Sequence, residues 1–143
     1  MWMPDELFGL FEESHFKNYP FVTIPQTFSD ERGWIANIAD GDLGDVAYIT
    51  SVKGAIRANH VHAQDWHLSF MISGSMHYSW ESNDKSIHKI LVSENDLIYT
   101  PPQVPHRMEF LENSKFIAIA KLRRSHLEYE ADTQRLPNEF FRD

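Results

Sequence analysis

Short apolar or alternating runs, separated by turn residues, fill most of the chain and limit the folds open to it. About ten such runs follow Pro20, with breakers such as Asp30–Gly33 and Ser73–Ser75 between them. Alternation at period two is typical of half-buried strands, and no long helical pattern separates the runs. The sequence therefore predicts an all-β sandwich or barrel. The runs are Phe21–Ile24, Trp34–Ala39, Val46–Val52, Ile56–His62, Trp66–Ser73, Met76–Trp80, Ile87–Val92, Leu97–Thr100, His106–Leu111 and Phe116–Leu122.

The length of 143 residues suits one domain. We expect an N-terminal extension at 1–20, a barrel at 21–122 and a C-terminal arm at 123–143. Residues 4–13 carry apolar positions at helical spacing and predict one short amphipathic helix. The charged tail after Leu122 is compatible with a short helix or an extended arm.

Composition excludes several classes of function. The chain has no cysteine, so disulfides and thiolate metal sites are absent. A formal charge of −8 disfavours nucleic acid as a partner. No run approaches the roughly 20 apolar residues of a membrane span, and Met1–Glu6 lacks the features of a secretory signal. We therefore expect a cytoplasmic protein that acts on a small molecule.

Histidine placement is the strongest chemical signal in the sequence. His60 and His62 are two residues apart in an expected strand, so both imidazoles can face one cavity. A metal ion held by imidazole needs such convergence, and further ligands should come from neighbouring strands. His67 and His106 are available for that role. We expect a divalent metal such as zinc, iron, nickel or manganese, because imidazole ligands do not identify the ion. Asp65 is a further candidate ligand.

These histidines also lie in a known frame. The first cupin motif has the form G-x5-H-x-H-x4-E-x6-G, and Gly54, His60, His62, His67 and Gly74 fit it without a gap. His67 stands where the family usually has Glu, which leaves a bound metal with more net positive charge. The second motif ends P-x-G-x-x-H, and Pro101–His106 resembles it, with Gln103 in place of Gly and Asn95 where the motif begins with Gly. The resemblance implies a cupin-type jelly roll with a metal at His60, His62, His67 and His106.

Two shorter segments resemble one branch of the cupins. Asp30–Gly33 matches the D-x-R-G step of nucleotide-sugar epimerases and ketoisomerases, and Arg57–His62 is similar to their R-G-x-H-x-H step, with Ala58 in place of Gly. The resemblance implies a sugar isomerase or epimerase of polysaccharide biosynthesis. His60 or His62 would be the base, and Arg57 would bind the diphosphate. A regular strand points Arg57 away from His60, unless a bulge near Ala58 intervenes. The proton donor of the family is a tyrosine, for which Tyr48, Tyr78 and Tyr99 are candidates.

Two other functions are open at this point. One is an iron-dependent dioxygenase built on the same histidines, and the other is a non-catalytic sugar-binding cupin. We also expect a homodimer, in which the apolar face of Trp66, Leu68, Phe70 and Ile72 packs on a second copy. The alternative is that this face packs inside the protomer.

Overall fold

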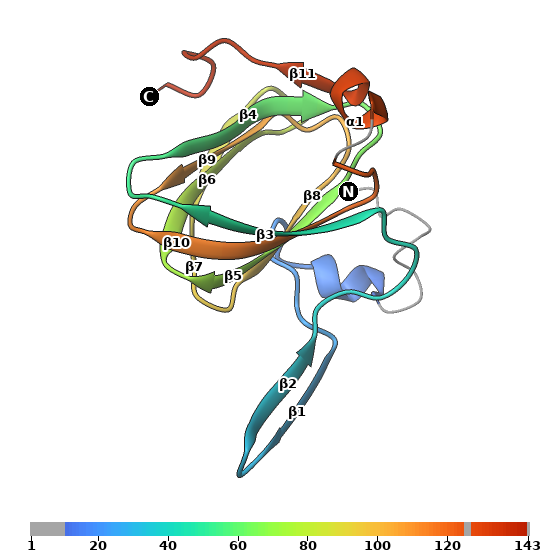
Figure 1. Ribbon diagram of the computed structural model, residues 1–143. Helices are drawn as coiled ribbons and strands as arrows, with labels where there is room; N and C mark the ends of the chain where they lie inside the picture. Colours follow the sequence, from blue (N-terminus) through green and yellow to red (C-terminus); the bar gives the residue numbers. More distant parts are fainter. Residues whose placement is uncertain (1–10, 125–126, 143) are drawn as a thin grey trace.

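The chain folds almost entirely into antiparallel strands, as seen in a computed structural model that describes residues 11–124 and 127–142 (Figure 1). One four-residue 3-10 helix, Glu13–Phe16, precedes the strands, and one short helix, α1 at Leu127–Asp132, lies between the last two strands. The strands are β1 (Gln26–Asp30), β2 (Gly33–Asn37), β3 (Asp45–Ser51), β4 (Ile56–His62), β5 (His67–Ser73), β6 (Ser75–Glu81), β7 (Ile87–Ser93), β8 (Leu97–Thr100), β9 (His106–Phe110), β10 (Ser114–Ala120) and β11 (Thr133–Arg135).

Two sheets form the barrel. One has the order β3-β10-β5-β8, and the other has the order β11-β4-β9-β6-β7. Strands that are distant in sequence pair in both sheets, which is the jelly-roll arrangement, so the predicted fold class is confirmed (Figure 1). Ser73–Ser75 joins β5 to β6 as the predicted tight turn, and Gly74 has the positive φ that such a turn needs.

Two strands were not predicted, and one predicted run is not a strand. β1 and β11 have the sequences QTFSD and TQR, which are too polar to form an apolar run. Phe21–Ile24 makes only an isolated bridge, between Phe21 and Ile98. The N-terminal run instead contributes apolar side chains to packing, with Val22 buried.

The space between the sheets is filled by one apolar cluster. Its buried members come from both sheets and alternate with outward-facing residues along each strand. They are Met71, Met76, Tyr78, Trp80, Val92, Ile98, Met108, Phe110, Phe116 and Ala118. Because this cluster occupies the barrel interior, any binding site has to lie toward an end of the barrel.

A second apolar cluster covers the outer face of the β3-β10-β5-β8 sheet. Phe11, Phe16 and Val22 pack there against Trp66 and Leu68, and both of the latter are completely buried. The face that we expected at a dimer interface therefore packs inside the protomer. The predicted helix at 4–13 falls mainly on residues outside the described part of the chain, which begins at Phe11.

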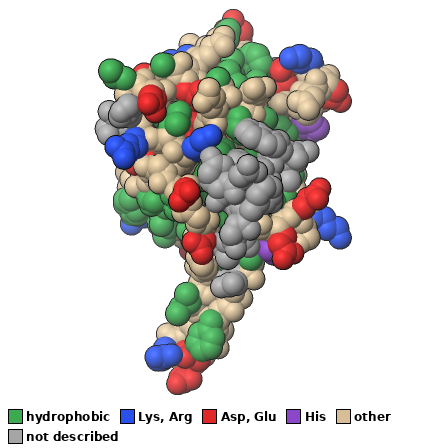
Figure 2. Space-filling model, turned by 90° about the vertical axis from the view of Figure 1, so that its right-hand side faces the viewer, with side chains coloured by type: hydrophobic (Ala, Val, Ile, Leu, Met, Phe, Trp, Pro, Cys, Tyr) green, Lys and Arg blue, Asp and Glu red, His purple; other side chains and the backbone are tan. Residues whose placement is uncertain are grey.

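The β1–β2 hairpin projects away from the barrel (Figure 1). Phe28, Trp34 and Ile35 on this hairpin are 56%, 52% and 68% exposed, and charged side chains lie at its tip (Figure 2). Arg32 and Asp30 form an ion pair there. Asp30–Gly33, the D-x-R-G step, is thus the turn of the hairpin. In the described part of the chain, no helix has the length and apolarity to cross a membrane.

Three residues that replace glycines of the family motifs have left-handed backbone. Ala58, Asn95 and Gln103 have φ values of 64°, 69° and 65°. Side chains with a Cβ rarely adopt these values, whereas glycine adopts them readily. The backbone has therefore kept the conformation that the motif glycines permit. Ala58 and Asn59 also lie at a bulge in the β4–β9 pairing.

Candidate active site

Four buried imidazoles meet near one end of the barrel. His60 and His62 lie at the end of β4, His106 begins β9, and His67 begins β5 on the opposite sheet. The ring centroid of His60 lies 4.4 Å from that of His62 and 4.8 Å from that of His106. The ring centroids of His62 and His67 are 4.9 Å apart. All four predicted metal ligands are therefore brought together. We call these four histidines the imidazole cluster.

The nitrogens of the cluster are only partly hydrogen-bonded. His106 Nδ1 lies 2.8 Å from the carbonyl oxygen of Val104, and His62 Nδ1 lies 3.1 Å from Thr133 Oγ1. His60 Nδ1 and His62 Nε2 are buried without a partner. One nitrogen from each of His60, His62 and His106 falls within 4.8 Å of the others. Buried polar atoms without partners are rare, so their presence here indicates a ligand-binding role.

Burial keeps the imidazoles of His60, His62 and His106 neutral. It lowers the pKa of His60 to about 2, with His106 and His62 adding repulsion. Burial also lowers the pKa of His106 to about 3 and, together with His67, that of His62 to about 4. Neutral imidazole is the form that binds metals and accepts protons. The donor set therefore fits a divalent cation without any change of protonation at neutral pH.

Asp65 forms a pair with His67. The Asp65 carboxylate lies 2.9 Å from His67 Nε2 and also accepts the backbone N–H groups of Lys121 and Leu122. Burial raises the pKa of Asp65, but the hydrogen bonds outweigh it and the pKa lies below its ordinary value. Asp65 lies two residues before His67, the first residue of β5, and residues two apart along an extended chain share a face.

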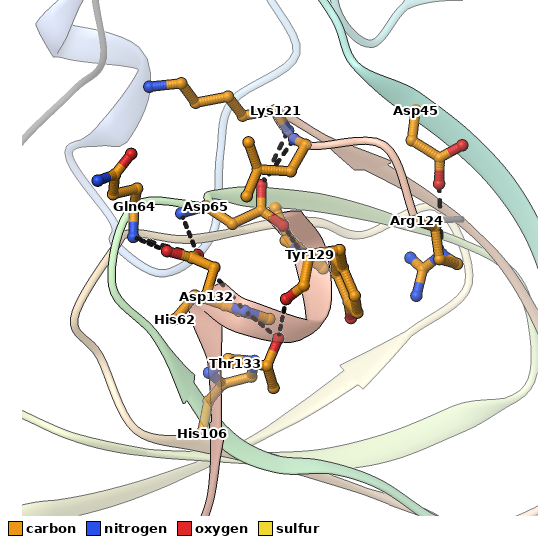
Figure 3. Close-up of polar contacts among 12 residues, drawn as sticks. Asp45, His62, Gln64, Asp65, His106, Lys121, Arg124, Tyr129, Asp132 and Thr133 are labelled. Carbon is orange, nitrogen blue, oxygen red and sulfur yellow. Dashed lines mark hydrogen bonds and ion pairs between the residues drawn. The ribbon is translucent and has the colours of Figure 1, made fainter. Parts of the chain in front are cut away.

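The C-terminal arm covers the outer side of the cluster (Figure 3). The Asp132 carboxylate accepts the backbone N–H groups of Gln64 and Asp65 and lies 3.9 Å from His62 Nδ1. Thr133 pairs with His62 in the β4–β11 ladder. The ring of Tyr129 lies 5.5 Å from that of His62. The arm thus orients His62 and forms one wall of the site.

Sequence reasoning missed these arm residues. Tyr129, Asp132 and Thr133 lie more than sixty positions after His62 and match no motif. Asp132 ends a six-residue helix whose sequence, LEYEAD, carries acidic residues at several positions. Nothing in this pattern distinguishes the one carboxylate that meets an imidazole from those that face solvent.

Arg57 lies apart from the imidazole cluster. Its guanidinium donates from Nε to Ser51 Oγ at 2.7 Å and from Nη2 to the Thr50 carbonyl at 2.8 Å. Arg57 pairs with Met108 toward the far end of β4, whereas His60 pairs with His106. Its predicted role in phosphate binding remains a prediction.

The three candidate tyrosines occupy different environments. Tyr78 is buried in the barrel interior with its ring 6.1 Å from that of His106, and its hydroxyl is 2.7 Å from Thr100 Oγ1. Burial raises the pKa of Tyr78, so the phenol stays protonated. Tyr99 belongs to the outer apolar cluster, and Tyr48 is exposed. Only Tyr78 of these three faces the imidazole cluster.

Two cavities lie beside the cluster. One has a volume of about 390 Å³ and is lined by His62, Gln103, Asp132 and Thr133, among others. The other has a volume of about 510 Å³ and is lined by residues that include Tyr19, Trp80, Glu81, Asn83 and Gln103. Gln103 borders both cavities. Substrate-sized space therefore adjoins the imidazoles on two sides of the Pro101–Val104 loop.

Solved structures with a similar fold include a sugar ketoisomerase and a sugar epimerase. QdtA, a sugar 3,4-ketoisomerase from Thermoanaerobacterium thermosaccharolyticum solved with TDP, is 22% identical over 80% of this chain and 86% of its own, with a TM-score of 0.65. A dTDP-4-dehydrorhamnose 3,5-epimerase from Sulfolobus tokodaii is 16% identical over 81% of this chain and 76% of its own, with a TM-score of 0.66.

CapF, a capsular polysaccharide assembling protein of Staphylococcus aureus, is 21% identical, with a TM-score of 0.59, and this chain spans 32% of its length. No protein-family model matches the sequence, and no curated protein matches it either. The likeness therefore establishes the cupin-type barrel. Together, fold and site define a cupin barrel with a buried imidazole cluster at one end.

Proposed function

We propose that this protein is an isomerase or epimerase that acts on a nucleotide-linked sugar. The observation that carries the proposal is the setting of His62, whose Nε2 has no partner while its Nδ1 is held by Thr133 beside Asp132. A neutral imidazole oriented by a carboxylate is a suitable base for moving a proton on carbon. The ketoisomerase and epimerase with the same fold support the choice of substrate.

His62, Asp132 and Tyr78 have separate roles in this reaction. His62 Nε2 accepts a proton from the carbon beside the sugar carbonyl, and the Asp132 carboxylate, 3.9 Å from Nδ1, stabilises the imidazolium that forms. Tyr78, which stays protonated, is the candidate proton donor on the His106 side. Return of the proton to the former carbonyl carbon, with the adjacent hydroxyl proton passing to the former carbonyl oxygen, completes a ketoisomerisation. Protonation of the original carbon on its opposite face by Tyr78 completes an epimerisation.

Deuterium exchange tests this function. Thymidine- and uridine-diphospho-4-keto sugars are incubated with the protein in deuterated water, and the sugar is followed by mass spectrometry. We expect incorporation of deuterium, reduced by roughly 10²–10⁴-fold in His62→Gln. His77→Gln, on a strand of the same sheet outside the cluster, is the matched control. Absence of exchange with every sugar, or equal exchange by wild type and His62→Gln, would contradict the proposal.

As a second candidate role of the cluster, we propose a metal-bound form in which His60, His62 and His106 hold a divalent cation and His62 is a ligand instead of the base. The two buried nitrogens without partners and the neutral state of all three rings support this proposal. His106 and His62 each engage the other ring nitrogen, as metal-binding histidines usually do. A bound cation would supply a Lewis acid for the carbonyl oxygen of the sugar. His67, paired with Asp65, borders the same centre.

Elemental analysis of purified protein and calorimetric titration with Zn²⁺ test the cation site. We expect about one ion per chain, and loss of binding in His60→Gln and His106→Gln but not in the exposed variant His88→Gln. Binding that is unaffected by the first two variants would place the ion elsewhere. Iron with substrate-dependent oxygen consumption would instead favour the dioxygenase.

We also propose that two copies associate through the β1–β2 hairpin. The exposed apolar residues of the hairpin and of β3, Val46 and Tyr48, are left uncovered in the protomer. β3 is an edge strand of its sheet, among the described residues. A reciprocal contact between hairpin and β3 face buries both sets in a two-fold arrangement, which is the commonest symmetry of homo-oligomers.

A further inference from the structure

The cavity of about 510 Å³ lies at the barrel end beside the imidazole cluster but is separate from it. Trp80 forms part of its wall and pairs directly opposite His106 in the β6–β9 register. Residues directly opposite in an antiparallel pair place their Cβ atoms about 4.5–5.5 Å apart. The cavity therefore adjoins the cluster. None of the four imidazoles is among the residues that line it.

The charge of the lining restricts what the cavity can hold. Among the residues that the structure describes, Tyr19 and the Glu81 carboxylate are the ionisable side chains of the lining, and no Lys or Arg is part of it. Lys85 pairs with Glu81 at 3.5 Å, but its side chain is 81% exposed and outside the lining. A diphosphate has several negative charges and would be repelled here. The cavity thus suits an uncharged part of a ligand.

The aromatic walls and the amide groups of the lining indicate which kind of uncharged group the cavity can bind. Tyr19 and Trp80 stand edge to face, with ring centroids 6.0 Å apart, and Pro101, Pro102 and Val104 add apolar wall. Asn83 and Gln103 supply amide groups that both donate and accept hydrogen bonds. Aromatic walls with amide groups at the rim match a planar heterocycle that carries carbonyl and N–H groups on one edge.

We propose that this cavity binds the base of the nucleotide-linked sugar. The inference rests on the proposed function and adds to it the part of the substrate that does not react. A hexose that exchanges protons has to reach an imidazole, and no imidazole lines the cavity. Besides the hexose, a nucleotide-linked sugar has two uncharged ring systems, the ribose and the base. We assign the base to this cavity because its aromatic walls suit a planar ring. The hexose then lies toward His62 across Gln103, which borders both cavities.

Calorimetric titration of the intact protein with three probes tests the assignment. The probes are TDP, inorganic pyrophosphate and glucose 1-phosphate, and the variants are Tyr19→Ala and Asn83→Ala. Leu91→Ala, which shortens an exposed side chain on β7, is the control. We expect Tyr19→Ala to weaken TDP binding by about fivefold or more, since base–aromatic contacts contribute roughly 1–3 kcal/mol. We expect Asn83→Ala to weaken it by at least twofold.

Several results would overturn the assignment. These are no binding of TDP to the wild type, TDP binding unchanged in both folded variants, or a loss of TDP affinity matched by an equal loss for pyrophosphate. Selective weakening of glucose 1-phosphate would place the hexose in this cavity instead. Asn83 is an exposed turn residue, so its variant remains informative if Tyr19→Ala fails to fold. Deuterium exchange is measured separately, so failure of the base site and failure of the isomerase proposal are distinguishable.

Discussion

His62 and Asp132 face each other across the junction between β4 and the C-terminal arm, with Nδ1 of one 3.9 Å from Oδ2 of the other. The same carboxylate accepts two backbone N–H groups from the segment that follows β4 (Figure 3). Asp132 therefore fixes both the arm and the local backbone. Its position makes the arm part of the candidate site, and several testable consequences concern this contact and its surroundings.

Asp132→Asn should slow proton exchange while leaving the fold intact. Asparagine retains an oxygen that can accept the N–H groups of Gln64 and Asp65, but it cannot stabilise a charged His62. We expect a rate loss of roughly 10–100-fold, with a loss of at most about 3 kcal/mol in the free energy of unfolding. Deuterium exchange and thermal unfolding measure the two effects. Glu130→Gln, on the same helix but exposed, should change neither. Equal rates for Asp132→Asn and wild type would remove Asp132 from the mechanism.

The metal-free protein should lose stability as the pH falls through the ordinary range of histidine. The folded-state pKa values of His60, His106 and His62, about 2, 3 and 4, lie below the unfolded value of 6.5. Between about pH 6.5 and pH 4 the unfolded chain therefore binds protons that the folded chain excludes, and the free energy of unfolding decreases with decreasing pH.

Each of the three histidines contributes at most about 1.4 kcal/mol per pH unit to this loss. Denaturant unfolding at several pH values, in the presence of a chelator, measures the slope. His106→Gln should reduce the slope, and His77→Gln should not. A slope that is the same in wild type and His106→Gln would show that His106 is not buried in its neutral form.

Replacing left-handed residues by glycine should stabilise the protein. Ala58 and Gln103 have φ values near 65°, which cost roughly 1–2 kcal/mol for a residue with a Cβ, while glycine loses about 0.5–1 kcal/mol through its greater freedom when unfolded. We expect Ala58→Gly and Gln103→Gly to raise the free energy of unfolding by about 0.5–1 kcal/mol. Asn95→Gly should gain less, because asparagine tolerates this conformation. Denaturant unfolding measures the series, and destabilisation by Ala58→Gly would contradict the backbone assignment.

Arg57→Ala separates a structural role from a role in binding phosphate. Because the guanidinium is held by Ser51 and Thr50 away from the imidazoles, we expect the KM for a nucleotide sugar to change by less than about twofold. Stability should fall by about 1–2 kcal/mol through the lost hydrogen bonds. Lys53→Ala, a nearby exposed cation, is the control. A tenfold rise in KM would support the phosphate role that the motif implies.

Ile35→Asp should dissociate the proposed dimer. Ile35 on the projecting hairpin is 68% exposed, and a buried charge at a contact is strongly unfavourable. We expect sedimentation equilibrium to give a dimer for the wild type and a monomer for Ile35→Asp. Leu91→Asp, which changes an exposed leucine on β7, should remain dimeric. A monomeric wild type would contradict the proposal.

Local patterns were sufficient to predict much of this protein. The period-two alternation predicted the strands whose inner faces are apolar, because burial on one face is recorded in neighbouring residues. The spacing of His60 and His62 placed both rings on one face of β4, and the motif frame predicted that His67 and His106 would join them. Ala58, Asn95 and Gln103, which stand where the motifs have glycine, have the left-handed backbone conformation that glycine readily adopts.

Other features depended on contacts between segments that are distant in sequence. β11 is polar and becomes a strand because it pairs with β4, and Asp132 reaches His62 only because α1 lies at the end of that strand (Figure 1). The Asp65 carboxylate is held beside His67 by the backbone N–H groups of Lys121 and Leu122, which are more than fifty positions away in sequence. The sequence by itself thus determined the barrel and its imidazoles through local periodicity and spacing. The tertiary structure decided which carboxylates orient those imidazoles, because that choice depends on long-range chain pairing, which leaves no local pattern.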